Sequence, residues 1–132
     1  MLKIIVNGTF DIVHRGHLHL LEYARSHLDS FVYVLIDSDR RVNQLKGPDR
    51  PVNNQNDRKF LLESLQYVDR VDIFDSDDEL RNLISSYKPD LMIKGSDYEG
   101  KPIIGSEFCK EIKFYAHTGH STTRLIQRIT DR

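Results

Sequence analysis

Residues 2–21 read LKIIVNGTFDIVHRGHLHLL and decide the fold. The short apolar run at 4–6 is followed by Asn7-Gly8, by a loop that leads to His14-Arg15-Gly16-His17, and then by a helical pattern. A buried strand that leads through a loop into a helix brings free backbone N–H groups together, and the helix dipole adds positive potential there. This stretch therefore predicts an anion site, which we interpret as a cradle for the phosphates of a nucleotide.

Downstream of this stretch, apolar strand patterns alternate with helical patterns. Further strands are expected at 31–36, 71–74, 91–93 and 111–115, and the apolar stripes of helices at 18–28, 60–68, 80–87 and 125–129. Such alternation is typical of right-handed βαβ units around a parallel sheet. We expect one α/β domain over residues 1–132, a Rossmann-like three-layer fold whose five-stranded parallel sheet carries helices on both faces. The basic segment 40–51 is expected to be irregular.

The composition fits a globular domain and argues against several classes of protein. The 132 residues carry a net charge of −1 at pH 7, so no overall basic field favours nucleic acid as a partner. The single cysteine, Cys109, excludes an internal disulfide and a cysteine-based metal cluster. Neither a secretory leader nor a stretch long enough to span a membrane is recognised, so a cytoplasmic protein is expected.

Four polar motifs begin where a predicted strand ends. They lie at 8–17, 37–50, 94–98 and 118–123. In open parallel sheets, ligands bind outside the carboxyl ends of the strands, near the point where the strand order reverses. The four motifs are therefore expected to share one rim of the sheet, around one binding site.

The two histidines of the motif at 14–17 stand three positions apart, which places both on one face of a helix that begins near Val13. Three interpretations stay open. The pair would bind zinc if a third ligand joined it, and the candidates, none at a recognisable spacing, are His19, His117 and His120. Alternatively, His14 would cap a turn while His17 packs. In the third interpretation both imidazoles donate to a bound anion, which Gly16 favours because a residue without Cβ lets a ligand approach the backbone.

The run Gly8-Thr9-Phe10-Asp11, followed by His14-Arg15-Gly16-His17, resembles the signature of the cytidylyltransferase-like nucleotidyltransferases, the HxGH family. The similarity extends through the chain and is greatest to the adenylyltransferase domains of ADP-heptose synthases. The matching positions are residues 45–53 (LKGPDRPVN), Arg58, Lys94-Gly95-Ser96-Asp97-Tyr98 and Ser121-Thr122-Thr123. Glycerol-3-phosphate cytidylyltransferases are the next most similar, and they share the run Asp97-Tyr98-Glu99-Gly100.

This resemblance implies an enzyme that transfers a nucleotidyl group from an NTP to a sugar phosphate or polyol phosphate and releases pyrophosphate. ATP is favoured, with an acceptor of the heptose 1-phosphate type; transfer from CTP to glycerol 3-phosphate is the alternative. The implied cofactor is Mg²⁺, held mainly by the nucleotide phosphates, and the implied assembly is a homodimer. A regulatory module that binds a nucleotide without turnover is the rival interpretation. A Rossmann dehydrogenase is excluded because no G-x-G-x-x-G motif follows the first strand.

The resemblance also implies a role for each matching residue. His14, His17 and Lys46 are the expected catalytic residues, with Lys46 reaching the α-phosphate or the acceptor phosphate from a flexible loop. The residues expected to bind the nucleotide and its phosphates are Gly8, Thr9, Phe10, Gly16, Lys94, Gly95, Asp97, Ser121, Thr122 and Thr123. The residues expected to contact the acceptor substrate are Asp11, Arg58 and His117, the last at the place where glycerol-3-phosphate cytidylyltransferases carry arginine.

Several of these residues also allow a plain structural interpretation. Lys46 and Arg50 would then be ordinary loop residues that aid solubility. Arg58 would pair with an acidic residue on the surface, and Asp11 would hold its own loop through an Asx-turn. Ser121 would act as a helix N-cap, which is compatible with binding phosphate.

Overall fold

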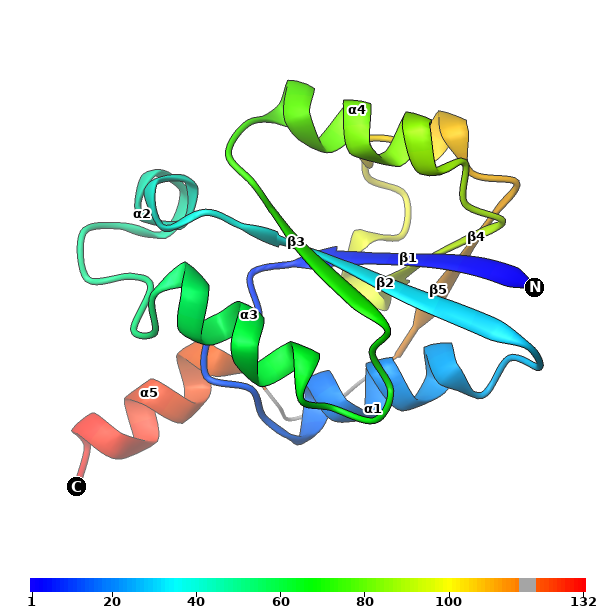
Figure 1. Ribbon diagram of the computed structural model, residues 1–132. Coiled ribbons are helices and arrows are strands. Elements are labelled where there is room, and N and C mark those ends of the chain that lie inside the picture. The colour runs from blue at the N-terminus through cyan, green and yellow to red at the C-terminus, as the bar shows by residue number, and fades with distance from the viewer. Residues whose placement is uncertain (117–120) are drawn as a thin grey trace.

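The computed structural model describes residues 1–116 and 121–132, and within them five strands form one parallel sheet (Figure 1). The strands are β1 (Leu2–Gly8), β2 (Ser30–Asp37), β3 (Arg70–Phe74), β4 (Leu91–Gly95) and β5 (Glu111–Tyr115). Their order is β3-β2-β1-β4-β5, so the chain builds outward from β1 in one direction and then outward from β4 in the other. The predicted five-stranded parallel sheet is confirmed, and its strand order reverses between β1 and β4.

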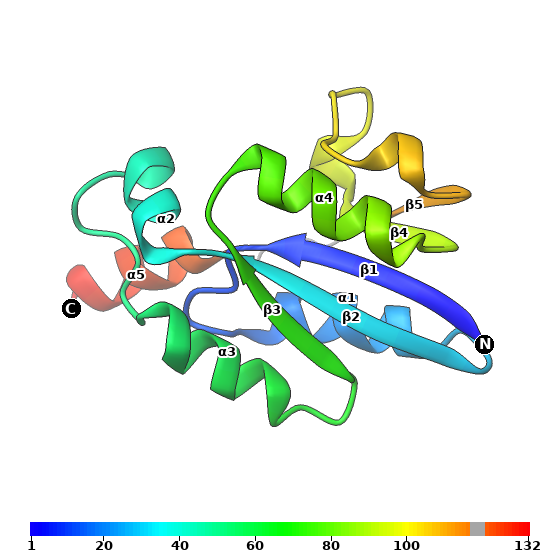
Figure 2. The same cartoon turned by 45° about the horizontal axis from the view of Figure 1, so that its top comes forward.

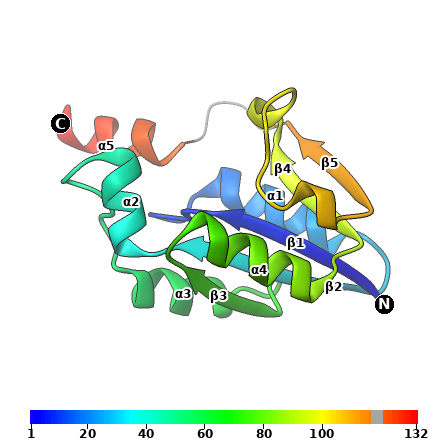
Figure 3. The same ribbon diagram turned by 90° about the horizontal axis from the view of Figure 1, so that it is seen from above.

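Helices cover both faces of the sheet, as Figures 2 and 3 show. The helices are α1 (Arg15–Arg25), α2 (Asp39–Lys46), α3 (Gln55–Glu63), α4 (Asp77–Tyr87) and α5 (Thr122–Thr130), with short 3₁₀ turns η1 (Ser96–Tyr98) and η2 (Ser106–Phe108). α1 and α3 pack on one face and α4 on the other, while α2 and α5 lie beyond the carboxyl ends of the strands. This arrangement confirms the three-layer α/β fold. Within the described residues, no helix has both the length and the apolar character needed to cross a membrane.

Two hydrophobic layers, one on each face, hold the helices to the sheet. Ile4 and Val6 of β1 belong to the layer that contains Leu21 of α1, whereas Ile5 belongs to the layer that contains Ile84 of α4. All five side chains are at most 2% exposed. Neighbouring residues of a strand point to opposite faces, so a strand covered on both sides is apolar at consecutive positions. That requirement is why the apolar run near the N-terminus predicted a buried strand.

The two central strands separate at their carboxyl ends. β1 pairs with β2 along its whole length, through Gly8. On its other side, the pairing of β1 with β4 ends at Ile5 and Met92, three residues before either strand ends (5 to 8 and 92 to 95). The strands therefore diverge and leave a crevice at the point where the strand order reverses, which is where α/β sheets bind ligands.

The segment that was expected to be irregular contains helix α2, which corrects that expectation. Its N-cap is Ser38, whose side chain accepts a hydrogen bond from the backbone N–H of Arg41, and its buried residue is Val42. This short helix carries only two apolar residues, Val42 and Leu45, too few to form a recognisable apolar stripe, so the sequence pattern failed to indicate it. Lys46 consequently stands in the last turn of a helix and not in a flexible loop.

The apolar stripe expected at 60–68 is wrong in its phase. Phe60 and Leu61 are 68% and 44% exposed, while the buried face of α3 carries Arg58 and Leu62. The helix ends at Glu63, so the later apolar residues of the expected stripe lie outside it. The pattern favoured the wrong phase because α3 turns a buried arginine, and not an apolar residue, toward the sheet.

Candidate active site

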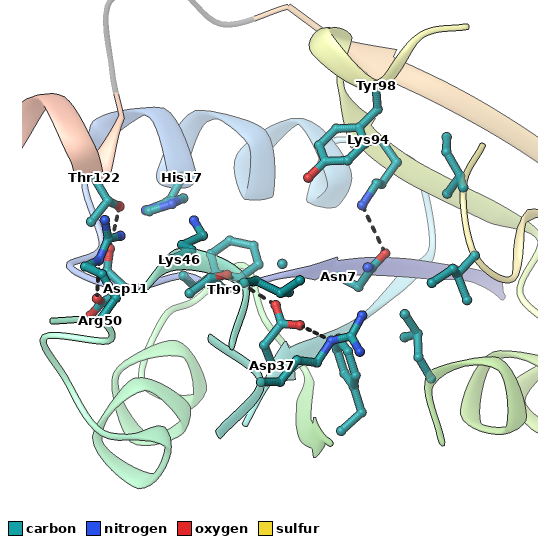
Figure 4. Close-up of a pocket in the computed structure, with 18 of the residues that line it drawn as sticks. Asn7, Thr9, Asp11, His17, Asp37, Lys46, Arg50, Lys94, Tyr98 and Thr122 are labelled. Carbon is teal, nitrogen blue, oxygen red and sulfur yellow. Dashed lines mark hydrogen bonds and ion pairs between the residues drawn. The ribbon is translucent and has the colours of Figure 1, made fainter. Parts of the chain in front are cut away.

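Two adjoining cavities open at the crevice between β1 and β4, with volumes of about 330 Å³ and about 260 Å³. The residues that line both are Asn7, Gly8, Thr9, Phe10, His17, Lys46, Lys94, Tyr98 and Thr122. In Figure 4, His17, Lys46 and Thr122 lie on one side of this shared space, and Lys94 with Tyr98 on the other. All four polar motifs of the sequence thus contribute residues to one connected space.

The loop between β1 and α1 holds an unusual backbone conformation. Phe10 and Ile12 adopt left-handed φ angles of 52° and 51°. This conformation costs a non-glycine residue about 1–2 kcal/mol, so the surroundings must impose it. Asp11, between them, is 1% exposed, and its carboxylate accepts hydrogen bonds from the backbone N–H groups of Val52 (2.6 Å) and Asn53 (2.9 Å). Asp11 therefore fixes its loop against the segment before α3, which corrects the expected Asx-turn within the loop.

Arg50 joins Asp11 from the same segment. Its Nε lies 3.6 Å from the Asp11 carboxylate and its Nη1 lies 3.4 Å from the hydroxyl of Thr123. Its Nε and Nη2 are buried and make no hydrogen bond within the described residues. An edge of two guanidinium N–H groups is the geometry that binds phosphate or carboxylate in a bidentate manner. Arg50, interpreted from the sequence as an ordinary loop residue, lines the larger cavity, and its one signal was its place within the run 45–53.

Arg58 is fixed beneath the cavities and lines neither of them. It is fully buried, and its guanidinium donates to three backbone carbonyls and one carboxylate. The acceptors, at 2.8–2.9 Å, are the carbonyls of Asn53, Thr9 and Asp37 and the carboxylate of Asp39. The side chain ties the ends of β1 and β2 to the start of α3, and its expected contact with an acceptor phosphate stays a prediction that this buried position does not support.

The N-terminus of α1 is capped by the two histidines of the motif. Nδ1 of His14 accepts from the backbone N–H of Gly16, and Nδ1 of His17 accepts from the backbone N–H of His14, both at 3.1 Å. The rings stack with 3.9 Å between their centroids. Because each Nδ1 is an acceptor, the proton of each neutral ring stands on Nε2, which is then the donor atom. The capping interpretation of His14 is confirmed, and it is compatible with donation to an anion.

The N-terminus of α5 is attached to the same loop. The hydroxyl of Thr122 donates to the backbone carbonyl of Asp11 (2.5 Å), and the Ser121 hydroxyl caps the helix by accepting from the backbone N–H of Arg124 (3.0 Å). Neither α5 nor α1 carries an acidic residue in its first turn. Two helix N-termini therefore direct N–H groups and positive potential toward the smaller cavity.

Two lysines bound the shared space. Lys46 stands at the end of α2, where desolvation of its ammonium and the nearby Arg50 charge lower its pKa. Lys94, at the end of β4, is 7% exposed; its Nζ lies 3.5 Å from Oδ1 of Asn7 and 4.1 Å from the centre of the Tyr98 ring. Burial lowers the pKa of Lys94 from 10.5 to about 8. Both close contacts are with uncharged groups, and no carboxylate among the described residues comes within ion-pair distance of this ammonium.

A second polar pair, which the sequence did not assign, lines the larger cavity. The carboxylate of Asp37 is almost fully buried and accepts from Nε of Arg41 (2.7 Å) and from the hydroxyl of Thr9 (3.2 Å). Arg41 also pairs with Asp77 at 2.6 Å. The apolar part of the same cavity is formed by Phe74, Leu80, Ile103 and Ile104. The sequence placed Asp37 in a polar turn, but Arg41 stands on the helix that the pattern missed.

The described residues form no cage for a metal ion. Across residues 1–116 and 121–132, no three His, Cys, Asp or Glu side chains gather as possible ligands. The oxygens of Asp11 accept backbone N–H groups, and those of Asp37 accept from Arg41 and Thr9. His117 and His120 of the zinc interpretation lie outside the described residues.

The placement of the predicted residues follows their assigned roles closely. All those assigned to catalysis or to the nucleotide line the smaller cavity: Gly8, Thr9, Phe10, His14, Gly16, His17, Lys46, Lys94, Gly95, Asp97, Ser121, Thr122 and Thr123. Of the three assigned to the acceptor, Asp11 lines the larger cavity, Arg58 lies beneath both, and His117 falls outside the described residues.

Comparison with known proteins places this geometry in a family. The profile of the cytidylyltransferase-like family matches residues 5–128. The chain therefore belongs to the cytidylyltransferase-like family and is a nucleotidyltransferase. A solved structure, the lipopolysaccharide core biosynthesis protein from Thermoplasma volcanium GSS1, shares the fold with a TM-score of 0.69 at 23% identity, over 92% of this chain and 99% of that one.

The similar curated proteins narrow the relationship. The bifunctional protein HldE of Campylobacter fetus subsp. fetus (strain 82-40) is 48% identical over 127 residues, which are 96% of this chain and 27% of that protein. The same-named protein of Helicobacter pylori (strain Shi470) is 44% identical, with the same shares of each chain covered. These relatives confirm the resemblance to ADP-heptose synthases. The chain spans about a quarter of the length of these relatives.

Proposed function

We propose that this chain transfers an adenylyl group from ATP to a sugar phosphate of the heptose 1-phosphate type and releases pyrophosphate. The observation that carries the proposal is the meeting of two helix N-termini with the paired histidines and Lys46 in one cavity. A triphosphate suits this place, because backbone N–H groups and helix dipoles stabilise anions there. The resemblance of residues 45–53 and 94–98 to ADP-heptose synthases supports the choice of nucleotide and acceptor.

The reaction needs no covalent intermediate with the protein. An oxygen of the acceptor phosphate attacks the α-phosphorus of ATP, and the bond from the α-phosphorus to the bridging oxygen breaks. The bridging oxygen keeps the electron pair and leaves as pyrophosphate, so no proton has to be transferred. The protein therefore acts by holding the two phosphates in line and by stabilising the charge that develops on the leaving group.

Each part of the smaller cavity has a proposed task in this step. Nε2–H of His14 and of His17 would donate to the α- and β-phosphates, where the leaving charge develops. The start of α5 at Ser121 and Thr122 would bind the β- and γ-phosphates, and Lys46 would reach the α-phosphate. The proposed nucleotide contacts from the main chain and from β4 are Gly8, Thr9, Phe10, Gly16, Gly95, Asp97 and Thr123.

Mg²⁺ would enter with the triphosphate and not in a protein cage, because no three possible ligand side chains gather among the described residues. When bound, it would neutralise part of the phosphate charge through phosphate oxygens and water. Protein side chains would then contribute hydrogen bonds and positive charge only. Removal of Mg²⁺ is therefore expected to abolish turnover, while a zinc chelator is expected to have no effect.

A screen of pyrophosphate release tests the proposal. ATP and CTP are each offered with heptose 1-phosphate, with glycerol 3-phosphate and with the unphosphorylated sugar. The proposal expects release with ATP and heptose 1-phosphate, and none with the unphosphorylated sugar. Release with CTP and glycerol 3-phosphate instead would establish the alternative, which the shared run Asp97-Tyr98-Glu99-Gly100 favours. Turnover with unphosphorylated sugars alone would refute both.

A further inference from the structure

The larger cavity differs in character from the smaller one. The helix-start residues His14, Gly16, Ser121 and Thr123 line only the smaller cavity. The larger cavity instead contains the buried carboxylate of Asp37 together with an apolar wall. Lys94 lies at the boundary, because it lines both cavities. We propose that Lys94, which the resemblance assigned to the nucleotide, binds the phosphate of the acceptor instead, and that Asp37 accepts hydrogen bonds from the acceptor's hydroxyl groups. This inference rests on the proposed function, and it assigns the larger cavity to the acceptor.

Within residues 1–116 and 121–132, no carboxylate lies within ion-pair distance of the Lys94 ammonium. The ammonium is held at 3.5 Å from the amide oxygen of Asn7 and over the ring of Tyr98, and both partners are uncharged. A buried cation without a carboxylate is costly unless an anion joins it. Asp37 and Asp97 act on it only from a distance, as charges that oppose the loss of its proton. A phosphate placed at the boundary of the two cavities would supply the missing partner.

The position of Lys94 also fits the direction of the reaction. In-line transfer requires the acceptor phosphate to meet the α-phosphate in the space that the two cavities share. His17 and Lys46 face that space from one side and Lys94 from the other (Figure 4). An acceptor phosphate bound by Lys94 would therefore lie opposite the groups proposed to hold the nucleotide.

Asp37 favours a polyol and disfavours a second polyanion in the larger cavity. Its carboxylate is fixed by Arg41 and Thr9, and a carboxylate with two such bonds can still accept hydrogen bonds from further donors. Hydroxyl groups are donors, whereas phosphate groups would be repelled by this charge. The apolar wall of Leu80 and Ile103 would pack against the carbon skeleton of a sugar.

Substitution of Lys94 tests the phosphate contact. Lys94→Met is expected to raise the KM for heptose 1-phosphate by about 10- to 100-fold, the usual range for a lost charge-assisted hydrogen bond, and to leave the KM for ATP within about threefold. Lys94→Arg is expected to restore much of the affinity. Lys101→Met, an exposed lysine of the same segment, is the matched control. A rise in the KM for ATP with an unchanged KM for the acceptor would overturn the assignment.

Substitution of Asp37 tests the hydroxyl contact. Asp37→Asn is expected to lower kcat/KM for heptose 1-phosphate about tenfold more than for glycerol 3-phosphate, which offers fewer hydroxyl groups. Asp78→Asn, with a side chain 92% exposed, is the control. An equal loss with both acceptors would show a merely structural role and overturn this half of the inference. Thermal unfolding of each variant checks that the fold is retained.

A binding measurement separates failure of this inference from failure of the proposed function. Calorimetry follows heptose 1-phosphate binding to wild-type and Lys94→Met protein, each saturated with a non-hydrolysable ATP analogue. Weaker binding by the variant supports the inference, and equal binding by both proteins overturns it. No binding by the wild type overturns it as well. Absence of pyrophosphate release in the wild type, with Lys94-dependent binding intact, would count against the proposed function alone.

Discussion

The two sides of the active-site space are built in different ways. One side, here called the loop wall, consists of residues 8–17 with Ser121–Thr123, and it presents backbone N–H groups, capped helix ends and two imidazoles. The other side, called the side-chain wall, consists of Asp37, Arg41 and Lys94, contributed by β2, α2 and β4. The loop wall is suited to a group common to all nucleotides, whereas the side-chain wall is suited to the part of a substrate that differs between enzymes.

The difference lies in what fixes each wall. The loop wall is held in place by two buried side chains: the Asp11 carboxylate accepts from two backbone N–H groups, and the Arg58 guanidinium donates to three backbone carbonyls. The side-chain wall is held differently. Asp37 and Arg41 bond to each other, and the contact of Lys94 with Asn7 is with an uncharged group. Replacing a residue there is therefore expected to change the chemistry of the cavity and to leave the backbone in place.

The largest expected effect comes from the imidazoles of the loop wall. His17→Ala is expected to lower kcat by about 10²- to 10³-fold, because it removes one donor from the developing charge. Its cap on the backbone N–H of His14 is lost as well, at about 1 kcal/mol of stability. Steady-state pyrophosphate release measures the first effect and urea denaturation the second.

His19→Ala is the matched control for this substitution. His19 stands on the same helix, contacts Arg15 and lines neither cavity. Its replacement is expected to leave kcat within about twofold, within the small effect of a surface change. Activity of the His17→Ala protein close to that of the wild type would disprove the donor role and leave His17 a structural cap.

The loop wall is the part that the sequence predicted well, for a local reason. The motif at 8–17 combines a strand end, a loop and helix caps within one short segment, so its chemistry follows from neighbouring residues. The alternation of apolar patterns likewise predicted the parallel sheet and its rim, because strand and helix periodicities are local. All the predicted nucleotide residues accordingly meet in one cavity.

The side-chain wall and the supports of the loop wall depend on contacts between distant segments. Asp11 and Arg50 meet across thirty-nine positions, and Arg58 reaches Thr9 across forty-nine. A buried arginine reads in the sequence as a surface residue, because burial of a charge becomes possible only when tertiary structure supplies its acceptors. Arg41 was missed with its helix, since that short helix carries too few apolar residues to form a recognisable stripe.

A smaller effect, on stability, is expected from the support of the loop wall. Asp11→Ala leaves two buried backbone N–H groups and the Arg50 cation without their acceptor, so unfolding free energy is expected to fall by about 3 kcal/mol. Urea denaturation followed by circular dichroism measures it. Asp49→Ala, an exposed aspartate of the same segment, is expected to change stability by less than about 0.5 kcal/mol. A loss below about 1 kcal/mol for Asp11→Ala would mean that other contacts hold the loop.

The smallest expected effect is a pH dependence that arises in the side-chain wall. Burial lowers the pKa of Lys94 to about 8, against the opposing charges of Asp37 and Asp97. Below that pH the ammonium is charged and attracts the acceptor phosphate; above it the charge is lost. With ATP saturating, kcat/KM for heptose 1-phosphate is therefore expected to fall with rising pH above about 8, approaching tenfold per pH unit.

Stability is expected to change in the opposite direction, which distinguishes this loss of activity from unfolding. Between about pH 8 and the ordinary lysine pKa of 10.5, the unfolded chain binds more of this proton than the folded chain, so the contribution of Lys94 to stability rises with pH. In Lys94→Arg the guanidinium stays charged throughout this pH range, so the decline in kcat/KM caused by deprotonation of Lys94 is expected to vanish. The neighbouring Asp37, Asp97 and Tyr98 are the same in both proteins. Rate profiles and urea denaturation from pH 7 to 9.5 compare the two proteins. An equal decline in kcat/KM for both proteins would mean that a group other than Lys94 titrates. Lys46 would be the next candidate, because its pKa is lowered too. The assignment of the acceptor phosphate to the side-chain wall would then be refuted.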